Sequence, residues 1–151
     1  MKTEFIHYGH DRFIREAFQP VENRELFPKP SGGLWASPVD ASYGWSQWCK
    51  DEDFAEINES NSFHFHIKGG ANVLHITSVA QLDDLPMQEC PIKSFTLFRC
   101  PDFEELIRRG VDAMWVDISA DRDLYMELYG WDCDSIVVLN PDVIEPIEEK
   151  G

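Results

Sequence analysis

Residues 62–68, SFHFHIK, alternate strictly between polar and apolar side chains, which commits this part of the chain to a β-sheet. Successive side chains of a strand point to opposite faces, so the two phenylalanines share one face and His64 and His66 share the other. The next residues, GGAN at 69–72, predict a tight reversal into a second strand, VLHI at 73–76. The two segments are therefore expected to form a β-hairpin.

Further short strands and helices are expected on either side of this segment. Strands are predicted at residues 3–8, 33–37, 92–98, 112–119 and 134–140, and helices at residues 11–18, 42–54, 79–85, 101–110 and 121–130. Residues 19–32 contain three prolines and are expected to form a long loop. The sequence predicts an α+β fold, a single domain over residues 1–151 with two small, mostly antiparallel sheets and short flanking helices.

The length and composition are those of one globular domain. The chain has 151 residues, of which 43% are hydrophobic, enough to bury a core. No run approaches the roughly 20 apolar residues that cross a bilayer, and the first residues lack the apolar centre of a signal peptide. We therefore expect a cytoplasmic protein that does not associate with membranes. The four cysteines show no CxxC or zinc-finger spacing and are expected to be free thiols.

The charge is acidic and unevenly distributed. The net charge is -15, and residues 101–151 hold fourteen acidic and four basic residues, or -10. Such a surface repels phosphate backbones, so broad nonspecific binding of nucleic acids is not expected. A small anionic ligand, or one nucleic-acid target, remains compatible with a local basic pocket near Arg12, Arg15 and Arg24. An alternative follows from the acidic third: the chain acts as an interaction protein, a nucleic-acid mimic or inhibitor that docks on a basic partner.

Common catalytic motifs are absent from the sequence. It has no Walker loop, no GxGxxG turn and no HExxH motif, and no serine or cysteine stands on a nucleophile elbow. His64 and His66, with His75 across the expected hairpin, could together hold a metal ion. No cysteine or carboxylate stands beside them at ligand spacing, so we favour a solvated strand face and predict no metal site.

Three separated segments carry the remaining signal: IHYGH at residues 6–10, GGLWASPVDASYGW at 32–45 and WDCDSIVVLNPDVI at 131–144. Their order and character resemble the ADP-ribosyltransferase fold, in the branch of diphtheria toxin and the poly(ADP-ribose) polymerases. That branch has a histidine and a glycine ending a first strand, and a glycine-aromatic strand leading into a helix with serine and tyrosine. An acidic residue then opens a late strand. The resemblance covers the chain from Phe5 to about Ile144.

The resemblance implies how the nicotinamide end of NAD+ would be held. Trp35 and Trp45 would sandwich the nicotinamide ring, as two tyrosines do in the family. Gly33 would let the backbone approach the carboxamide and hydrogen-bond it, and Ser42 would bind the same group. The tryptophans would keep the flat stacking surface that the tyrosines provide.

The resemblance also implies the contacts of the remaining part of NAD+. His7, followed closely by Gly9, would hold the adenosine-side ribose by a hydrogen bond. Arg12 or Arg15 would meet the pyrophosphate, because guanidinium groups match phosphate oxygens. Here the sequence departs from the polymerases, because Tyr8 stands between the histidine and the glycine.

Asp134 takes the place of the family's catalytic glutamate, with Asp132 as a second candidate. In the family this carboxylate binds the nicotinamide-side ribose and stabilises the positive charge that develops as the glycosidic bond breaks. Aspartate is one methylene shorter than glutamate, so the strand must lie nearer the ribose. Strand alternation would place Asp132 and Asp134 on the same side.

Each of these residues also has a purely structural interpretation. The tryptophans could belong to the core, and the glycines could serve the turn after Pro30. His7 could simply be a satisfied strand-end histidine. The arginines could be surface charges on a helix, and the two aspartates could be solvated residues in a turn before a strand.

The resemblance implies a mono-ADP-ribosyltransferase that transfers ADP-ribose from NAD+ to a macromolecular acceptor, such as a small bacterial or phage toxin or effector. NAD+ would be its substrate, without a metal, and a neutralising antitoxin or a basic protein would be its partner. Two alternatives remain: the acidic interaction protein, and a catalytically inactive member of the same fold that still binds NAD+.

Overall fold

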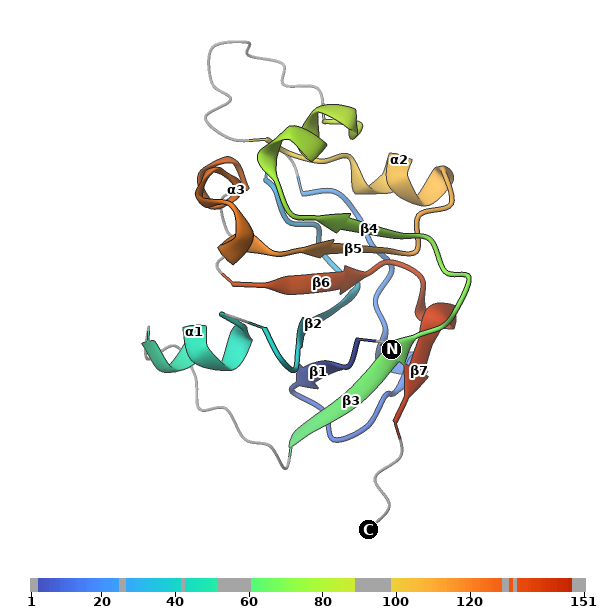
Figure 1. Cartoon of the computed structure of the whole chain (residues 1–151). Helices are drawn as coiled ribbons and strands as arrows, with labels where there is room; N and C mark the ends of the chain where they lie inside the picture. The colour runs from blue at the N-terminus through green and yellow to red at the C-terminus, as the bar shows by residue number, and fades with distance from the viewer. Residues whose placement is uncertain are drawn as a thin grey trace.

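The computed structural model describes residues 3–24, 27–41, 43–51, 61–88, 99–128, 131 and 133–147. Strands and short helices are interspersed along the chain, which confirms the predicted α+β class (Figure 1). Within these ranges no helix combines the length and the apolar character that crossing a membrane requires.

The strands of the described residues form one sheet of seven, in the order β4-β5-β6-β2-β1-β3-β7, which curls across the molecule (Figure 1). In chain order they are β1 (Phe5–Tyr8), β2 (Leu34–Pro38), β3 (Ser62–Ile67), β4 (Val73–Ile76), β5 (Ala113–Val116), β6 (Ser135–Val138) and β7 (Ile144–Pro146). Strands β4 and β5 run parallel, and the other pairs are antiparallel. The strand predicted at residues 92–98 lies outside the described residues.

Among the described strands the expectation of two separate sheets is wrong, because β2 belongs to both halves of one sheet. Residues 34–36 of β2 pair with β6, whereas Ser37 and Pro38 pair with β1. The strand therefore changes its main partner within five residues and joins the two halves. Both halves show ordinary strand patterns, so the sequence does not reveal that one strand connects them.

The predicted hairpin between β3 and β4 is also wrong. Strand β3 pairs with β1 and β7, while β4 pairs with β5 at the other edge of the sheet. Asn72 directs this arrangement: its backbone N–H donates to Asp112 Oδ2 at 2.8 Å, and its Nδ2 donates to the Gly110 carbonyl at 3.2 Å. These contacts begin β4 beside β5, so GGAN connects two distant strands instead of reversing the chain.

The helices are short. The α-helices are α1 (Trp45–Asp51), α2 (Phe103–Arg108) and α3 (Arg122–Glu127), and the 3-10 helices are η1 (Arg15–Ala17), η3 (Val79–Asp84), η4 (Ile118–Ala120) and η5 (Pro141–Val143). The helix predicted at residues 11–18 is wrong, because only η1 forms there. Ile14 is extended, and the Phe13 ring packs on Phe63 at a centroid distance of 6.2 Å. This packing of Phe13 on the core takes the place of a regular helix.

Two hydrophobic clusters cover opposite faces of β6. Val137 belongs to the cluster under α2, α3 and η3, whereas Ile136 and Val138 belong to the cluster of Phe5 and its aromatic neighbours on β3. All four residues of β6 are buried. Packing on both faces therefore holds β6 in place. The candidate site lies at the beginning of this strand.

Candidate functional site

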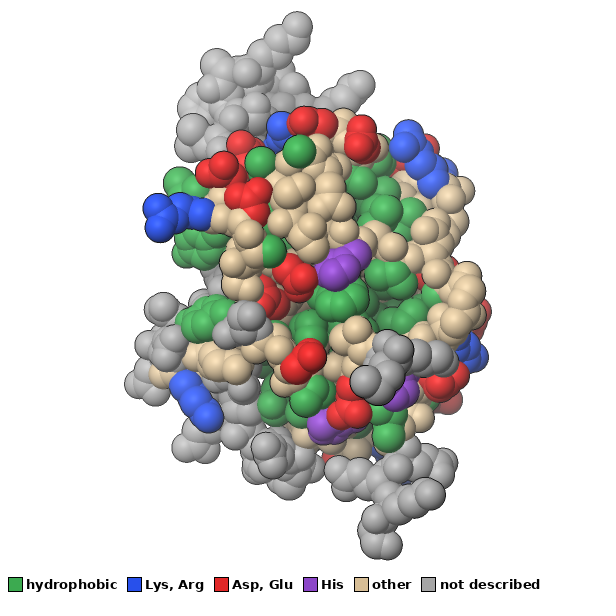
Figure 2. All heavy atoms as spheres, in the orientation of Figure 1, with side chains coloured by type: hydrophobic (Ala, Val, Ile, Leu, Met, Phe, Trp, Pro, Cys, Tyr) green, Lys and Arg blue, Asp and Glu red, His purple; other side chains and the backbone are tan. Residues whose placement is uncertain are grey.

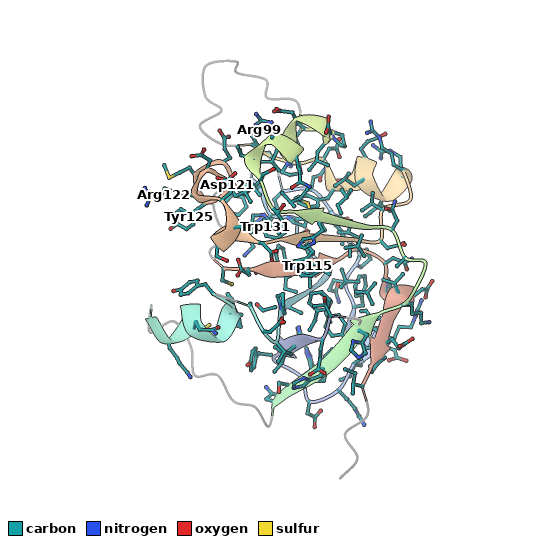
Figure 3. All side chains as sticks on the ribbon, viewed as in Figure 1. Arg99, Trp115, Asp121, Arg122, Tyr125 and Trp131 are labelled. Atoms are coloured by element: carbon teal, nitrogen blue, oxygen red, sulfur yellow. The ribbon has the colours of Figure 1, made fainter. Side chains whose placement is uncertain are left out.

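An aromatic cavity of about 290 Å³ lies where β1, β2 and the start of β6 meet α1. Its aromatic walls come from His7, Tyr8, Trp35, Trp45 and Trp131, and its remaining lining from Ile6, Lys29, Ala36, Ser37, Cys133 and Ser135. Trp131 follows α3 in the chain, and Figure 3 places it beside that helix. The cavity thus collects flat side chains from β1, from the segment that holds Trp35 and Trp45, and from Trp131. We call it the aromatic cavity below.

His7 is held in one tautomer at the edge of this cavity. Its Nδ1 donates to the Trp35 carbonyl at 2.6 Å, because a carbonyl oxygen can only accept. Burial lowers the pKa of His7; the bond to Trp35 acts to raise it, and nearby His10 acts to lower it further. The neutral ring leaves Nε2 as an acceptor, and this atom lies 3.4 Å from Nδ1 of the exposed His10.

The tryptophans are fixed by contacts around the cavity. Trp35 packs edge-on against Trp131 with ring centroids 4.8 Å apart, and Trp131 Nε1 donates to the Pro28 carbonyl at 3.0 Å. The ammonium group of Lys29 lies 4.6 Å from the centre of the Trp35 ring, within the range of a cation–π contact. Lys29 therefore brings a positive charge to an otherwise aromatic wall.

The N-terminus of α1 is tied to the sheet beside the cavity. The Trp45 backbone N–H donates to Ser37 Oγ at 2.9 Å, and the Gly44 N–H donates to Gln47 Oε1 at 3.0 Å. These two bonds satisfy amide groups that a helix start leaves without partners inside the helix. They also fix the backbone at Trp45, whose side chain lines the cavity.

The floor of the cavity contains small polar side chains. Ser135 Oγ donates to the Cys133 carbonyl at 3.0 Å and lies 3.3 Å from Cys133 Sγ. Burial raises the pKa of the Cys133 thiol, while Ser135, Lys29 and Ser37 act to lower it. The thiol therefore stays protonated at neutral pH and is a weak nucleophile.

Asp134 is buried, and its carboxylate is not part of the cavity lining. Oδ1 accepts from the Ser119 N–H at 2.8 Å, and Oδ2 accepts from Ser119 Oγ at 2.7 Å and from the Tyr43 N–H at 3.2 Å. The Asp134 N–H donates in turn to the Tyr43 carbonyl at 2.7 Å. Asp134 thus joins the start of β6 to the segment that leads into Trp45. The second predicted acid, Asp132, lies outside the described residues.

The predicted glycines have packing roles in this structure. The Gly33 N–H donates to the Gln19 carbonyl at 2.9 Å, and a Cβ at Gly33 would lie 3.0 Å from the Val138 carbonyl oxygen. Gly9 has φ of +122° and donates its N–H to the Asn61 carbonyl at 2.8 Å. Neither glycine lines the aromatic cavity, so the backbone approach expected at Gly33 serves the sheet.

Two further predicted contacts are not part of the cavity lining. Arg12 is exposed, and Arg15 pairs with Asp142 at 2.5 Å on the surface. Ser42 lies outside the described residues. The positive group in the cavity is instead Lys29, which the sequence reasoning missed because no motif marks it.

The three histidines considered for a metal site have separate partners. His64 Nδ1 contacts Glu4 at 2.5 Å, His66 Nδ1 contacts the Thr3 carbonyl at 3.1 Å, and His75 Nε2 contacts Asp117 at 2.8 Å. Across the described part of the chain, no three histidine, cysteine or acidic side chains come together as metal ligands.

A second hollow of about 380 Å³ adjoins the aromatic cavity, and we call it the polar compartment. The two share Ile6, Tyr8, Ser37 and Trp45. Its further polar lining comes from Gln47, Ser62 and His64. Trp45 therefore borders both the aromatic cavity and the polar compartment.

Comparisons with protein-family models, with curated proteins and with solved structures found no match to this chain.

Proposed function

We propose that the chain is a mono-ADP-ribosyltransferase of the ADP-ribosyltransferase-like fold, with a split NAD+-binding cleft, acting on a macromolecular acceptor. One observation carries the proposal. His7 from the first of the segments that resemble the family, and Trp35 and Trp45 from the second, line the same cavity. Flat side chains around a few polar groups are the usual lining of a site for a planar ligand.

In the proposed complex the nicotinamide ring lies against Trp35 and Trp45. The volume of about 290 Å³ is at the lower end for ligand sites, so the cavity holds the nicotinamide and its ribose, and the ADP part leaves past His7 and Lys29. His7 Nε2 accepts from a ribose hydroxyl in place of His10. The ammonium group of Lys29 meets a phosphate oxygen, a role that lysine fills as a point charge.

A second candidate function is NAD+ binding without transfer, and the position of Asp134 favours it. Its carboxylate oxygens already accept from Ser119 and Tyr43, outside the cavity lining. A carboxylate in this position contributes by fixing the Tyr43 to Trp45 segment. Under the transferase proposal, Asp132 then becomes the stronger candidate for the catalytic acid.

The proposal is tested by titrating the protein with NAD+ and following tryptophan fluorescence. We expect saturable quenching in the wild type and at least about tenfold weaker binding in Trp45→Ala and His7→Ala, because each loses a side chain of the cavity wall. Trp115→Phe is the matched control, since Trp115 lies outside the aromatic cavity, stacked on His75. No quenching up to millimolar NAD+ in the folded protein would refute the proposal.

Release of nicotinamide from NAD+ separates the two candidate functions. Release by the wild type supports transfer, whereas binding without release supports the binding-only alternative. Asp134→Asn refines the result: a catalytic Asp134 would leave NAD+ affinity intact and abolish release. We expect weaker binding instead, because an amide has only one acceptor oxygen and cannot accept all three hydrogen bonds that Ser119 and Tyr43 donate to the two carboxylate oxygens.

A further inference from the structure

His64 and Glu4 form a hydrogen-bonded pair beside the candidate site. Glu4 directly precedes β1, and His64 lies opposite Ile6 in the pairing of β3 with β1. His64 Nδ1 donates to Glu4 Oε2 at 2.5 Å, so in the neutral form of the ring Nε2 is the acceptor. The side chains are 31% and 41% exposed, which lets protons exchange with water.

This pair borders the polar compartment. His64 and Ser62 line the compartment from β3, and Trp45 lines both this compartment and the aromatic cavity. A group bound in the polar compartment would therefore lie next to a ligand that rests on Trp45. A histidine oriented by a carboxylate is a common form of general base, because the carboxylate fixes the ring and stabilises its protonated form.

We propose that His64, oriented by Glu4, is a general base for the acceptor of ADP-ribose, and that the polar compartment is the acceptor site. The inference rests on the proposed transferase function. His64 is the proposed catalytic residue, and Glu4 is a positioning residue that acts through it.

The step balances without a further reactant. The bond between the ribose anomeric carbon and the nicotinamide nitrogen breaks, and its electron pair leaves with nicotinamide, which becomes neutral. The acceptor oxygen bonds to the anomeric carbon, and its proton passes to His64 Nε2 and then to solvent. NAD+ and an acceptor with one O–H group give the ADP-ribosylated acceptor, nicotinamide and one proton.

The same chemistry limits the class of acceptor. A carboxylate attacks without losing a proton and gains nothing from a base, whereas a neutral hydroxyl must lose one. The acceptor expected in the polar compartment is therefore a group that loses a proton as it attacks, and we propose a hydroxyl group. Water is its simplest representative and serves as the test acceptor.

The experiment measures NAD+ hydrolysis by the full chain and its variants. We expect His64→Gln to hydrolyse NAD+ about 10²-fold more slowly and Glu4→Gln to lose about tenfold, in the usual range for a general base and its orienting group. His66→Gln is the matched control, because His66 lies two residues further on β3, bonds the Thr3 carbonyl and lines neither hollow. It should keep the wild-type rate.

Rescue by azide distinguishes a general base at position 64 from a residue with only a structural role. Azide is an anion and attacks without losing a proton, so it should restore NAD+ consumption in His64→Gln and give ADP-ribosyl azide. If His64→Gln hydrolyses NAD+ slowly and azide does not restore NAD+ consumption, His64 is not a general base. A hydrolysis rate of His64→Gln equal to that of the wild type would lead to the same conclusion. If the wild type binds NAD+ but does not hydrolyse it, this inference and the transferase proposal both fail, while the binding-only alternative stands.

Discussion

The His7 ring is partly buried and neutral, and this makes it sensitive to pH. Burial lowers its pKa in the folded chain, whereas an unfolded histidine titrates near pH 6.5. Just below that pH the unfolded chain binds more protons than the folded one, so the contribution of His7 to stability is complete above about pH 6.5. It is lost as the pH falls through the folded pKa.

We therefore expect the free energy of unfolding to fall between pH 7 and pH 5 more steeply in the wild type than in His7→Gln. Urea unfolding at a series of pH values measures both slopes. The difference between the two proteins at pH 8 gives the pH-independent cost of losing the bond to Trp35 and serves as the reference. Equal slopes would show that His7 does not titrate differently in the folded chain.

At this scale the sequence indicated which aromatic side chains lie together, but not where Asp134 and Gly33 lie. His7, Trp35 and Trp45 line one cavity, and Asp134 and Gly33 are not part of its lining. The direction of Asp134 depends on a bend at residues 133–134, where strand alternation does not apply. The role of Gly33 depends on Gln19, in a loop without a repeating pattern.

The segment before β2 packs closely against the loop at residues 19–22. This close approach is possible because Gly32 has no side chain. This residue has φ of +76°, and a Cβ there would lie 2.1 Å from the Pro20 carbonyl oxygen. Gly110, after α2, has a similar φ of +85°, but a Cβ there would meet nothing within 4 Å. A substitution at Gly110 therefore tests the cost of backbone strain alone, whereas a substitution at Gly32 adds the cost of a steric clash.

We expect Gly110→Ala to lower the free energy of unfolding by about 1–2 kcal/mol, the cost of placing a side chain in a left-handed conformation. Gly32→Ala should cost at least about 2 kcal/mol more, because the backbone of Pro20 must also move. Thermal and urea unfolding compare the two variants. If both variants lose the same free energy of unfolding, the loop at residues 19–22 moves away at no cost and does not fix the start of β2.

The elements show the same limit of sequence reasoning over longer distances. Most strands were predicted within a few residues, because alternation and turn residues are local signals. The partners of β2 and β4 were not, since they depend on contacts such as the one between Asn72 and Asp112, forty positions apart. Local patterns indicate what a segment becomes and leave open what it pairs with.

The whole molecule carries a net charge of -15, and Figure 2 shows acidic side chains gathered near η3 and α3. In Figure 3, Arg122 and Tyr125 of α3 point away from the body of the protein, and Tyr125 is 52% exposed. The charge repels an anion such as NAD+ at long range, whereas Lys29 attracts it at the cavity. The repulsion acts over a longer distance than the attraction by Lys29. Added salt therefore weakens the repulsion more than the attraction.

Raising the ionic strength from 10 to 150 mM shortens the Debye length from about 30 Å to about 8 Å. The distant acidic charges are then screened, while a phosphate in contact with Lys29 is affected less. We expect NAD+ affinity to rise roughly twofold over this range, and the affinity for uncharged nicotinamide to stay constant. Lys29→Gln should bind NAD+ more weakly at every salt concentration and keep the same upward trend. Affinity that falls with salt would mean that nearby cations, and not the overall acidic charge, govern the approach of the ligand.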